Sequence, residues 1–198
     1  MRVKAKARLL VPFLSALLLA AAGSCMAQPV ELEGVKLEPT AKVGATTLQL
    51  NGAGVRTRVV FKVYVAGLYV PQKSSNPATL LADKGARRVS INLLRNVDAD
   101  TFVKALNDGL HNNHTEAQLA ALKPQIDALN AILISAVEVK KGDVIHFDYL
   151  PEAGTRTTLN GRALGSAIAG DTFFNAVLRT WLGDKTSDAG LKKGLLGG

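Results

Sequence analysis

NGAGVRTRVVFKVYVAGLYV, residues 51–70, joins a glycine-rich segment, an arginine and a long apolar run without a break. Gly52 and Gly54 predict a tight turn, where the backbone takes positive φ or comes close to another group. Residues 59–70 are almost wholly apolar and rich in β-branched and aromatic types, which is typical of a strand buried on both faces. The segment therefore predicts a turn followed by a central strand.

Arg56 stands just beyond this predicted turn. At the mouth of a buried strand, a guanidinium would hold a fixed positive fork against a planar anion such as a carboxylate or phenolate. The alternative is a surface arginine that pairs with an acid. The sequence leaves both interpretations open.

The other segments predict one α+β domain in which an antiparallel sheet carries helices on one face. Asp98 or Asp100 can cap a first long helix, and Thr115 with Gln118 makes a capping box for a second, which Pro124 is expected to kink or divide. A last helix should run from near residue 171 to 183, with an apolar core-facing stripe. The predicted strands are residues 30–37, 46–50, 59–70, 88–95, 144–150, 155–159 and 162–168.

The order GxGxR and then FKVYVAGLYV resembles the chalcone isomerase family, in particular its exported bacterial chalcone-isomerase-like members. Residues 105–136 continue the likeness weakly. Residues 171–198, DTFFNAVLRTWLGDKTSDAGLKKGLLGG, continue it well, with the WLGDK and LKKGLLG elements. The resemblance covers most of the chain after residue 27. It implies an open-faced β-sandwich, in which a large antiparallel sheet is covered by helices and a ligand cleft lies between the two layers.

The resemblance also implies a chemistry that needs no cofactor, in which a bound chalcone phenolate attacks an enone of the same molecule. Arg56 matches the family's arginine, and Thr180, three residues before Gly183, matches its helix hydroxyl. These two are the catalytic candidates if the protein is an enzyme. Tyr64 falls at the position of the family's strand threonine, where its ring would reshape the cavity. Thr180 can equally be a threonine at the edge of the core that bonds a preceding carbonyl. Tyr64 can equally be an ordinary core tyrosine.

A tyrosine and an asparagine seven residues apart on a helix of the active enzymes have no match in this chain. The corresponding helix offers Thr101 with Asp108, or Asp100 with Asn107. Chalcone cyclisation is therefore in doubt, although Thr101 and Asp108 remain candidate ligand-binding residues.

The first 27 residues predict a signal peptide. A basic segment with Arg2, Lys4, Lys6 and Arg8 precedes an apolar core, and a small residue, Ala27, comes before Gln28. The apolar core is short for a permanent membrane span. Cleavage after Ala27 takes the formal net charge from +8 to +4, which removes most of the support for a nucleic-acid partner. We expect a periplasmic domain of residues 28–198.

Cys25, the only cysteine, leaves a second reading in which it becomes the acylated first residue of a lipoprotein.

Other constellations are weaker. His111 and His114, with Asp108 nearby, have a spacing that can bind a metal, but HNNH is more typical of a fraying helix end, so no metal site is predicted. Arg88 or Arg95 could add a second cation to the cleft, although a surface role is favoured for either. The pair Lys192-Lys193 reads as a solvated tail.

Three functions fit these observations. The first is a binder of a small apolar anion, a fatty acid or an aromatic acid, with little or no catalysis. The second is an isomerase of the intramolecular lyase type, acting on a chalcone-like or other substrate. The third is a structural or interaction protein whose cleft is filled by its own side chains. Cavity volume beside Arg56 separates the third function from the other two. The ligand and the oligomeric state do not follow from the sequence.

Overall fold

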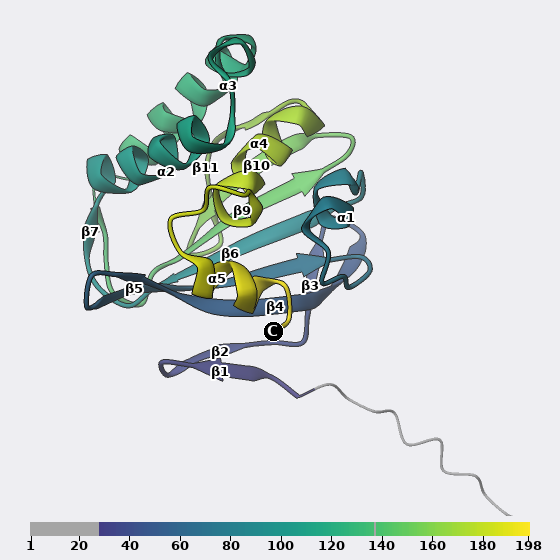
Figure 1. Cartoon of the computed structure of the whole chain (residues 1–198), viewed down its shortest axis with the longest axis vertical. Coiled ribbons are helices and arrows are strands. Elements are labelled where there is room, and N and C mark those ends of the chain that lie inside the picture. The colour runs from purple at the N-terminus through teal and green to yellow at the C-terminus, as the bar shows by residue number, and fades with distance from the viewer. Residues whose placement is uncertain (1–27, 137) are drawn as a thin grey trace, which may run out of the picture.

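A seven-stranded antiparallel sheet forms the centre of the computed structural model, which describes residues 28–136 and 138–198. The sheet curls beneath a layer of helices (Figure 1). The expected α+β architecture is confirmed. In spatial order the strands are β11 (Arg162–Ile168), β10 (Gly154–Leu159), β9 (Val144–Leu150), β6 (Arg87–Leu93), β5 (Phe61–Val70), β4 (Thr46–Arg58) and β3 (Thr40–Val43).

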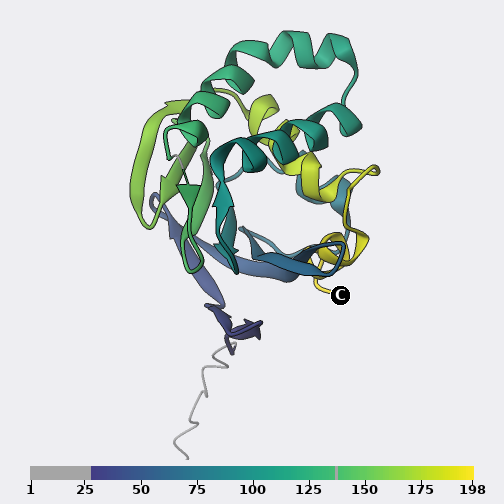
Figure 2. The same ribbon diagram turned by 90° about the vertical axis from the view of Figure 1, so that its left-hand side faces the viewer.

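The helices cover one face of this sheet, and a small hairpin covers part of the other (Figures 1 and 2). The main core lies between sheet and helices, while a second cluster of buried side chains, with Leu48, Val65 and Tyr69, lies beneath the hairpin. No helix within the described residues is long and apolar enough to cross a bilayer. The helices are α1 (Pro77–Ala82), α2 (Ala99–Asn113), α3 (Glu116–Ile134), α4 (Asp171–Leu182) and α5 (Ala189–Leu195), and the short strands are β1 (Val30–Leu32), β2 (Val35–Leu37), β7 (Val97–Asp98) and β8 (Glu138–Val139).

The expectation of a turn at Gly52 and Gly54 is wrong. β4 continues through both glycines, neither of which has a positive φ, and the chain turns at Val59 and Val60 instead. The alternative reason for glycine, close approach, is confirmed. A Cβ at Gly52 would lie 2.6 Å from Gly197 N, so the backbone of α5 and its C-terminal end rests directly on β4. Arg56 therefore lies on β4, before the turn.

The predicted strand 30–37 is also wrong as a single element. It is a hairpin of β1 and β2 that turns at Glu33 (φ 52°) and Gly34 (φ 76°). Glycine at this position admits the left-handed backbone at little cost, and the two strands then pair side by side. β3, which the sequence analysis did not predict, follows this hairpin.

The helix signals are largely confirmed. Asp98 caps α2, and Thr115 with Gln118 forms the expected capping box of α3. α3 is continuous through Pro124, so the expected division there is wrong. Gly183 follows α4 directly, and the core-facing stripe of Phe174, Val177, Leu178 and Trp181 is buried.

The predicted solvated tail is an ordered helix. α5 buries Leu191 and Leu195, and Lys192 Nζ donates to Gly183 O over 3.0 Å. The sequence analysis missed it because seven residues with two glycines have weak intrinsic helix propensity. Packing against β4 stabilises this helix instead.

The N-terminal end of α4 is anchored by Arg87, a fully buried arginine. Its guanidinium donates to Asp171 Oδ1 and Asn175 Oδ1, each over 2.7 Å. It also lies over the rings of Tyr149 and Phe174, 5.0 and 4.9 Å from their centroids. A buried charge is tolerated only when it is paired and hydrogen-bonded, and here these contacts fix α4 on the sheet.

We predict that Gly52→Ala lowers the free energy of unfolding by about 1 to 3 kcal/mol, the usual cost of forcing an extra carbon into a close-packed contact. The new Cβ would meet the backbone of residues 194–197, which cannot rotate away. Urea unfolding followed by circular dichroism measures the change.

Gly190→Ala in α5 is the matched control, because its Cβ would make only an ordinary contact with Asp188 Oδ1 at 3.4 Å. This variant should be neutral or slightly stabilising, since alanine favours a helix. Equal stability of Gly52→Ala and wild type would show that the backbone contact is unimportant.

Candidate functional site

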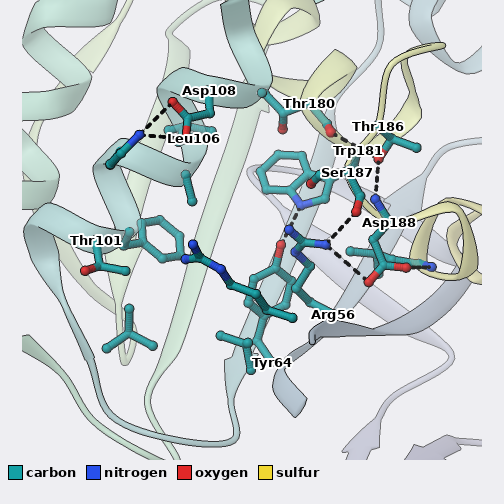
Figure 3. Close-up of a pocket in the computed structure, with 18 of the residues that line it drawn as sticks. Arg56, Tyr64, Thr101, Leu106, Asp108, Thr180, Trp181, Thr186, Ser187 and Asp188 are labelled. Atoms are coloured by element: carbon teal, nitrogen blue, oxygen red, sulfur yellow. Dashed lines mark hydrogen bonds and ion pairs between the residues drawn. The ribbon is translucent and has the colours of Figure 1, made fainter. Parts of the chain in front are cut away.

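A pocket of about 470 Å³ lies between one end of the sheet and the helices α2, α4 and α5. All five residues that the sequence analysis named for a ligand, Arg56, Tyr64, Thr101, Asp108 and Thr180, contribute to its lining (Figure 3). They come from β4, β5, α2 and α4. The remaining lining residues are Arg58, Val63, Val97, Phe102, Lys104, Ala105, Leu106, Gly109, Asn112, Trp181, Thr186, Ser187, Asp188 and Leu191.

Arg56 lies in the pocket wall and is also paired with an acid, so the two alternatives for this residue are found together. Its Nη1 donates to Ser187 O over 3.1 Å and to Asp188 Oδ2 over 3.3 Å. Within the described chain, Nε and Nη2 have no protein acceptor. The edge of the guanidinium formed by Nε and Nη2 is thus available for a bidentate contact with a planar anion.

Asp188 holds Arg56 in place and begins the next helix. Its Oδ1 accepts from Leu191 N, which caps α5, and its Oδ2 accepts from Thr57 N, each over 2.9 Å. Burial would raise the pKa of the Asp188 carboxyl, but the two backbone N–H groups and the guanidinium outweigh burial and lower this pKa. Asp188 is therefore ionised at neutral pH, and its charge is shared among three donors.

Tyr64 lies opposite Arg56 on the neighbouring strand β5. Its hydroxyl accepts from Trp181 Nε1 over 2.9 Å. Burial raises the pKa of the Tyr64 phenol, so the phenol stays neutral and keeps its hydrogen. That hydrogen has no acceptor within the described residues. Because the indole already occupies one lone pair, the hydroxyl can act as a donor to a ligand in the pocket.

Thr180 adopts the structural alternative considered for it. Its Oγ1 donates to Val177 O over 2.8 Å, three residues earlier on α4, so its hydrogen is already committed. A Cβ atom added at Gly109 of α2 would lie only 2.9 Å from the Thr180 Cβ, so Thr180 packs in the space that glycine leaves. Thr180 therefore brings α2 close to α4 and forms part of the pocket wall, and its oxygen can still accept a hydrogen bond.

Thr101 and Asp108 occupy the exposed rim of the pocket, on α2. Asp108 accepts from Lys104 Nζ over 3.0 Å in a pair one helical turn apart. Of the two pairs considered, this one lines the pocket, whereas Asn107 turns toward α3 and bonds Asn130 over 3.3 Å. Where the active enzymes of the family have a helix tyrosine and an asparagine, this rim has the Thr101 hydroxyl and the Lys104–Asp108 ion pair.

The sequence analysis missed Arg58, Lys104 and the segment 186–188, all of which line the pocket. Arg58 could have been found, because residues i and i+2 of a strand point to the same side as a rule. Together with Arg56 and Lys104 it gives the pocket three cations against the two carboxylates of Asp108 and Asp188. The local electrostatic field therefore favours an anion.

The other candidate residues lie elsewhere. Arg88 forms a bidentate pair with Asp148, with both distances 2.6 Å, and Arg95 lies over the ring of Phe61. The rings of His111 and His114 each contact the carbonyl four residues earlier over 2.9 Å, as at a helix end. Within the described residues no three potential ligands gather as a metal site would require.

Residues 29–197 match a protein-family model described as chalcone isomerase-like. The chain belongs to the chalcone isomerase-like family. The resemblance found in the GxGxR and WLGDK elements is thereby confirmed. A search of curated proteins finds no match.

Among solved structures, the chain is similar to a fatty-acid binding protein from Arabidopsis thaliana. The TM-score is 0.64 at 10% sequence identity, over 85% of this chain and 96% of the other. At that identity the likeness concerns the fold, and it agrees with the expected sheet covered by helices.

We predict that Asp188→Asn lowers the free energy of unfolding at pH 7 by about 1 kcal/mol, a typical cost of impairing a helix cap. The folded-state pKa of Asp188 is lowered below its unfolded value, so its stabilising effect is present above about pH 4 and is lost as the pH falls further. The difference in the free energy of unfolding between wild type and variant should therefore shrink below that pH. Urea titrations from pH 7 to pH 3 measure it.

Asp184→Asn is the matched control, because the side chain of Asp184 is fully exposed. It should change stability by less than about 0.5 kcal/mol at any of these pH values. A difference for Asp188→Asn that stayed constant down to pH 3 would contradict the assigned role of its charge.

Proposed function

We propose that this protein binds a small apolar anion, such as a fatty acid, in the pocket beside Arg56. The observation that carries the proposal is an open volume of about 470 Å³ next to a guanidinium with one free edge. This volume lies within the range of about 300 to 1,000 Å³ that is usual for small-molecule sites. Little or no catalysis is part of the proposal.

The anionic group of the ligand would lie against Arg56 and Tyr64. The free edge of Arg56 can donate two parallel hydrogen bonds to a carboxylate, and the Tyr64 hydroxyl can donate a third. Arg56 and Tyr64 are directly opposite each other on the paired strands β4 and β5, so the two polar groups can act on the same ligand group. Charge-assisted hydrogen bonds of this kind are stronger than neutral ones, which gives the site its preference for an anion.

The apolar part of the ligand would extend along the remaining lining. That apolar surface comes from three helices and a strand: Leu106 and Phe102 of α2, Trp181 of α4, Leu191 of α5 and Val63 of β5. Burying an alkyl chain against it would contribute about 0.8 kcal/mol for each methylene removed from water. The plant protein that shares this fold is named as a fatty-acid binding protein, which supports a ligand of this class.

The two other functions receive less support. A cleft filled by its own side chains would leave no volume beside Arg56. For an intramolecular lyase, orientation and charge stabilisation depend on groups that touch the substrate. Here the helix tyrosine and asparagine are replaced by Thr101 and the ion-paired Asp108, and the Thr180 hydrogen is bonded to Val177. Binding is thus the function that the geometry supports best.

We predict that Arg56→Ala weakens the binding of a medium-chain fatty acid such as decanoate by roughly 2 to 5 kcal/mol, because the carboxylate loses its charged partner. Arg56→Lys should recover only part of the affinity, since a point charge cannot reproduce the bidentate fork. Isothermal titration calorimetry of residues 28–198 measures both.

Arg162→Ala is the matched control, because Arg162 is an exposed arginine outside the pocket, on β11. It should bind decanoate like wild type, and circular dichroism should show that every variant remains folded. If Arg56→Ala binds as tightly as wild type, Arg56 has a structural role only and the proposal fails.

We further propose that the protein acts in the periplasm, after a signal peptide of residues 1–27 has been removed. The support is the basic segment, apolar core and small residue before Gln28. These residues lie outside the described part of the chain. N-terminal sequencing of the exported protein should begin at Gln28, whereas an acylated Cys25 would show that it is a lipoprotein instead.

A further inference from the structure

Three of the most exposed large apolar side chains in the described structure are consecutive. Val59, Val60 and Phe61 have exposed fractions of 89%, 75% and 57%, and they form the end of the hairpin that joins β4 to β5. We call residues 58–62 the β4–β5 tip, which lies at the left-hand end of the sheet in Figure 1. By contrast, Ile134 is a single exposed apolar residue at the end of α3, 46% exposed.

Folding alone does not account for this sequence. Arg58 pairs with Phe61, so Val59 and Val60 form a two-residue hairpin loop. Such loops favour asparagine and glycine, which tolerate positive φ. Val59 nevertheless has φ of 58°, an unfavourable conformation for a β-branched residue. Val59 thus carries a conformational cost, and both valines expose apolar surface, a conflict that is typical of functional sites.

Cationic side chains surround the apolar tip. Arg58 and Lys62 flank the three apolar residues, and the guanidinium of Arg95 lies 4.8 Å from the centroid of the Phe61 ring. Lys62 Nζ also donates to Glu33 Oε1 over 2.7 Å, so one of the three charges is partly neutralised. An apolar end with cations just behind it is complementary to a bilayer with anionic headgroups, where each lysine or arginine near the surface adds to the attraction.

We propose that the β4–β5 tip docks onto anionic phospholipid bilayers. Val59, Val60 and Phe61 enter the boundary between headgroups and acyl chains, while Arg58, Lys62 and Arg95 contact the phosphates. The cations favour a lipid surface over a second copy of the chain, since two identical tips would repel each other.

This docking would place the pocket next to the membrane. Arg58 belongs to both the β4–β5 tip and the pocket lining, and Val63 of the lining follows the tip directly on β5. A fatty acid could then move between the pocket and the bilayer without crossing much water. That consequence rests on the proposed function, whereas docking itself does not depend on a ligand.

Vesicle flotation tests the proposal with residues 28–198, because both described cores lie within residues 32–196 and residues 1–27 would themselves bind lipid. Wild type should float with phosphatidylglycerol–phosphatidylethanolamine vesicles and much less with phosphatidylcholine vesicles. The double change Val59→Asn with Val60→Ser should reduce partitioning to anionic vesicles at least about tenfold, because two apolar side chains are lost. Added salt should release wild type.

The same double variant separates docking from folding. Asparagine tolerates the positive φ at position 59, so the variant should melt at a higher temperature than wild type while binding vesicles less. Ile134→Ser is the control, and it should float like wild type. Neither valine lines the pocket, so decanoate affinity should be unchanged, which separates failure of docking from failure of ligand binding.

Two results would overturn the proposal. One is a wild-type protein that does not float with anionic vesicles, or a double variant that floats equally well. The other is concentration-dependent self-association in gel filtration that the double variant abolishes, which would assign the tip to a second copy of the chain.

Discussion

The site depends on a contact between two backbones that only glycine permits. Gly52 and Gly54 of β4 and Gly194 of α5 have no side chains, and a Cβ at any of them would meet the opposite backbone at 3.0 Å or less. α5 can therefore lie directly on the strand. Asn51 strengthens the contact, since its Nδ2 donates to Leu195 O over 2.7 Å from a buried position. With α5 in place, Asp188 reaches both Arg56 and the N–H of Thr57.

Two arginines show how burial decides what a guanidinium does. Arg87 is enclosed by Asp171, Asn175 and two aromatic rings, so its charge is fully used in holding α4 on the sheet. Arg56 is only partly buried, and one of its nitrogens, Nη1, pairs with Asp188. A desolvated charge without partners would be costly, whereas a partly solvated one can keep donors for a ligand. The difference in surroundings makes one residue structural and the other a candidate for binding.

The apolar strand, the caps and α4 could be predicted because their signals are local. Residues 65–70 of β5 are buried on both faces, as the unbroken apolar run indicates. Asp98 and Thr115 cap α2 and α3 with their own side chains, and Gly183 follows the last turn of α4. Five pocket residues were named through the family resemblance, and they do lie around one cavity. Their roles follow only from partners, which the resemblance does not provide.

The sequence by itself determined the periodic elements, the family and the presence of an arginine near the cleft. Only the tertiary structure decided that β4 runs through the glycines, that residues 189–195 form the helix α5, and that Arg56 pairs with Asp188, 132 residues later in the chain. The reason is that glycine permits a turn and a close contact equally, and a short helix gains its stability from the surface it covers. Hydrophobic periodicity indicates which side of an element is buried. It does not indicate which other element covers that side, because that contact forms only in the folded chain.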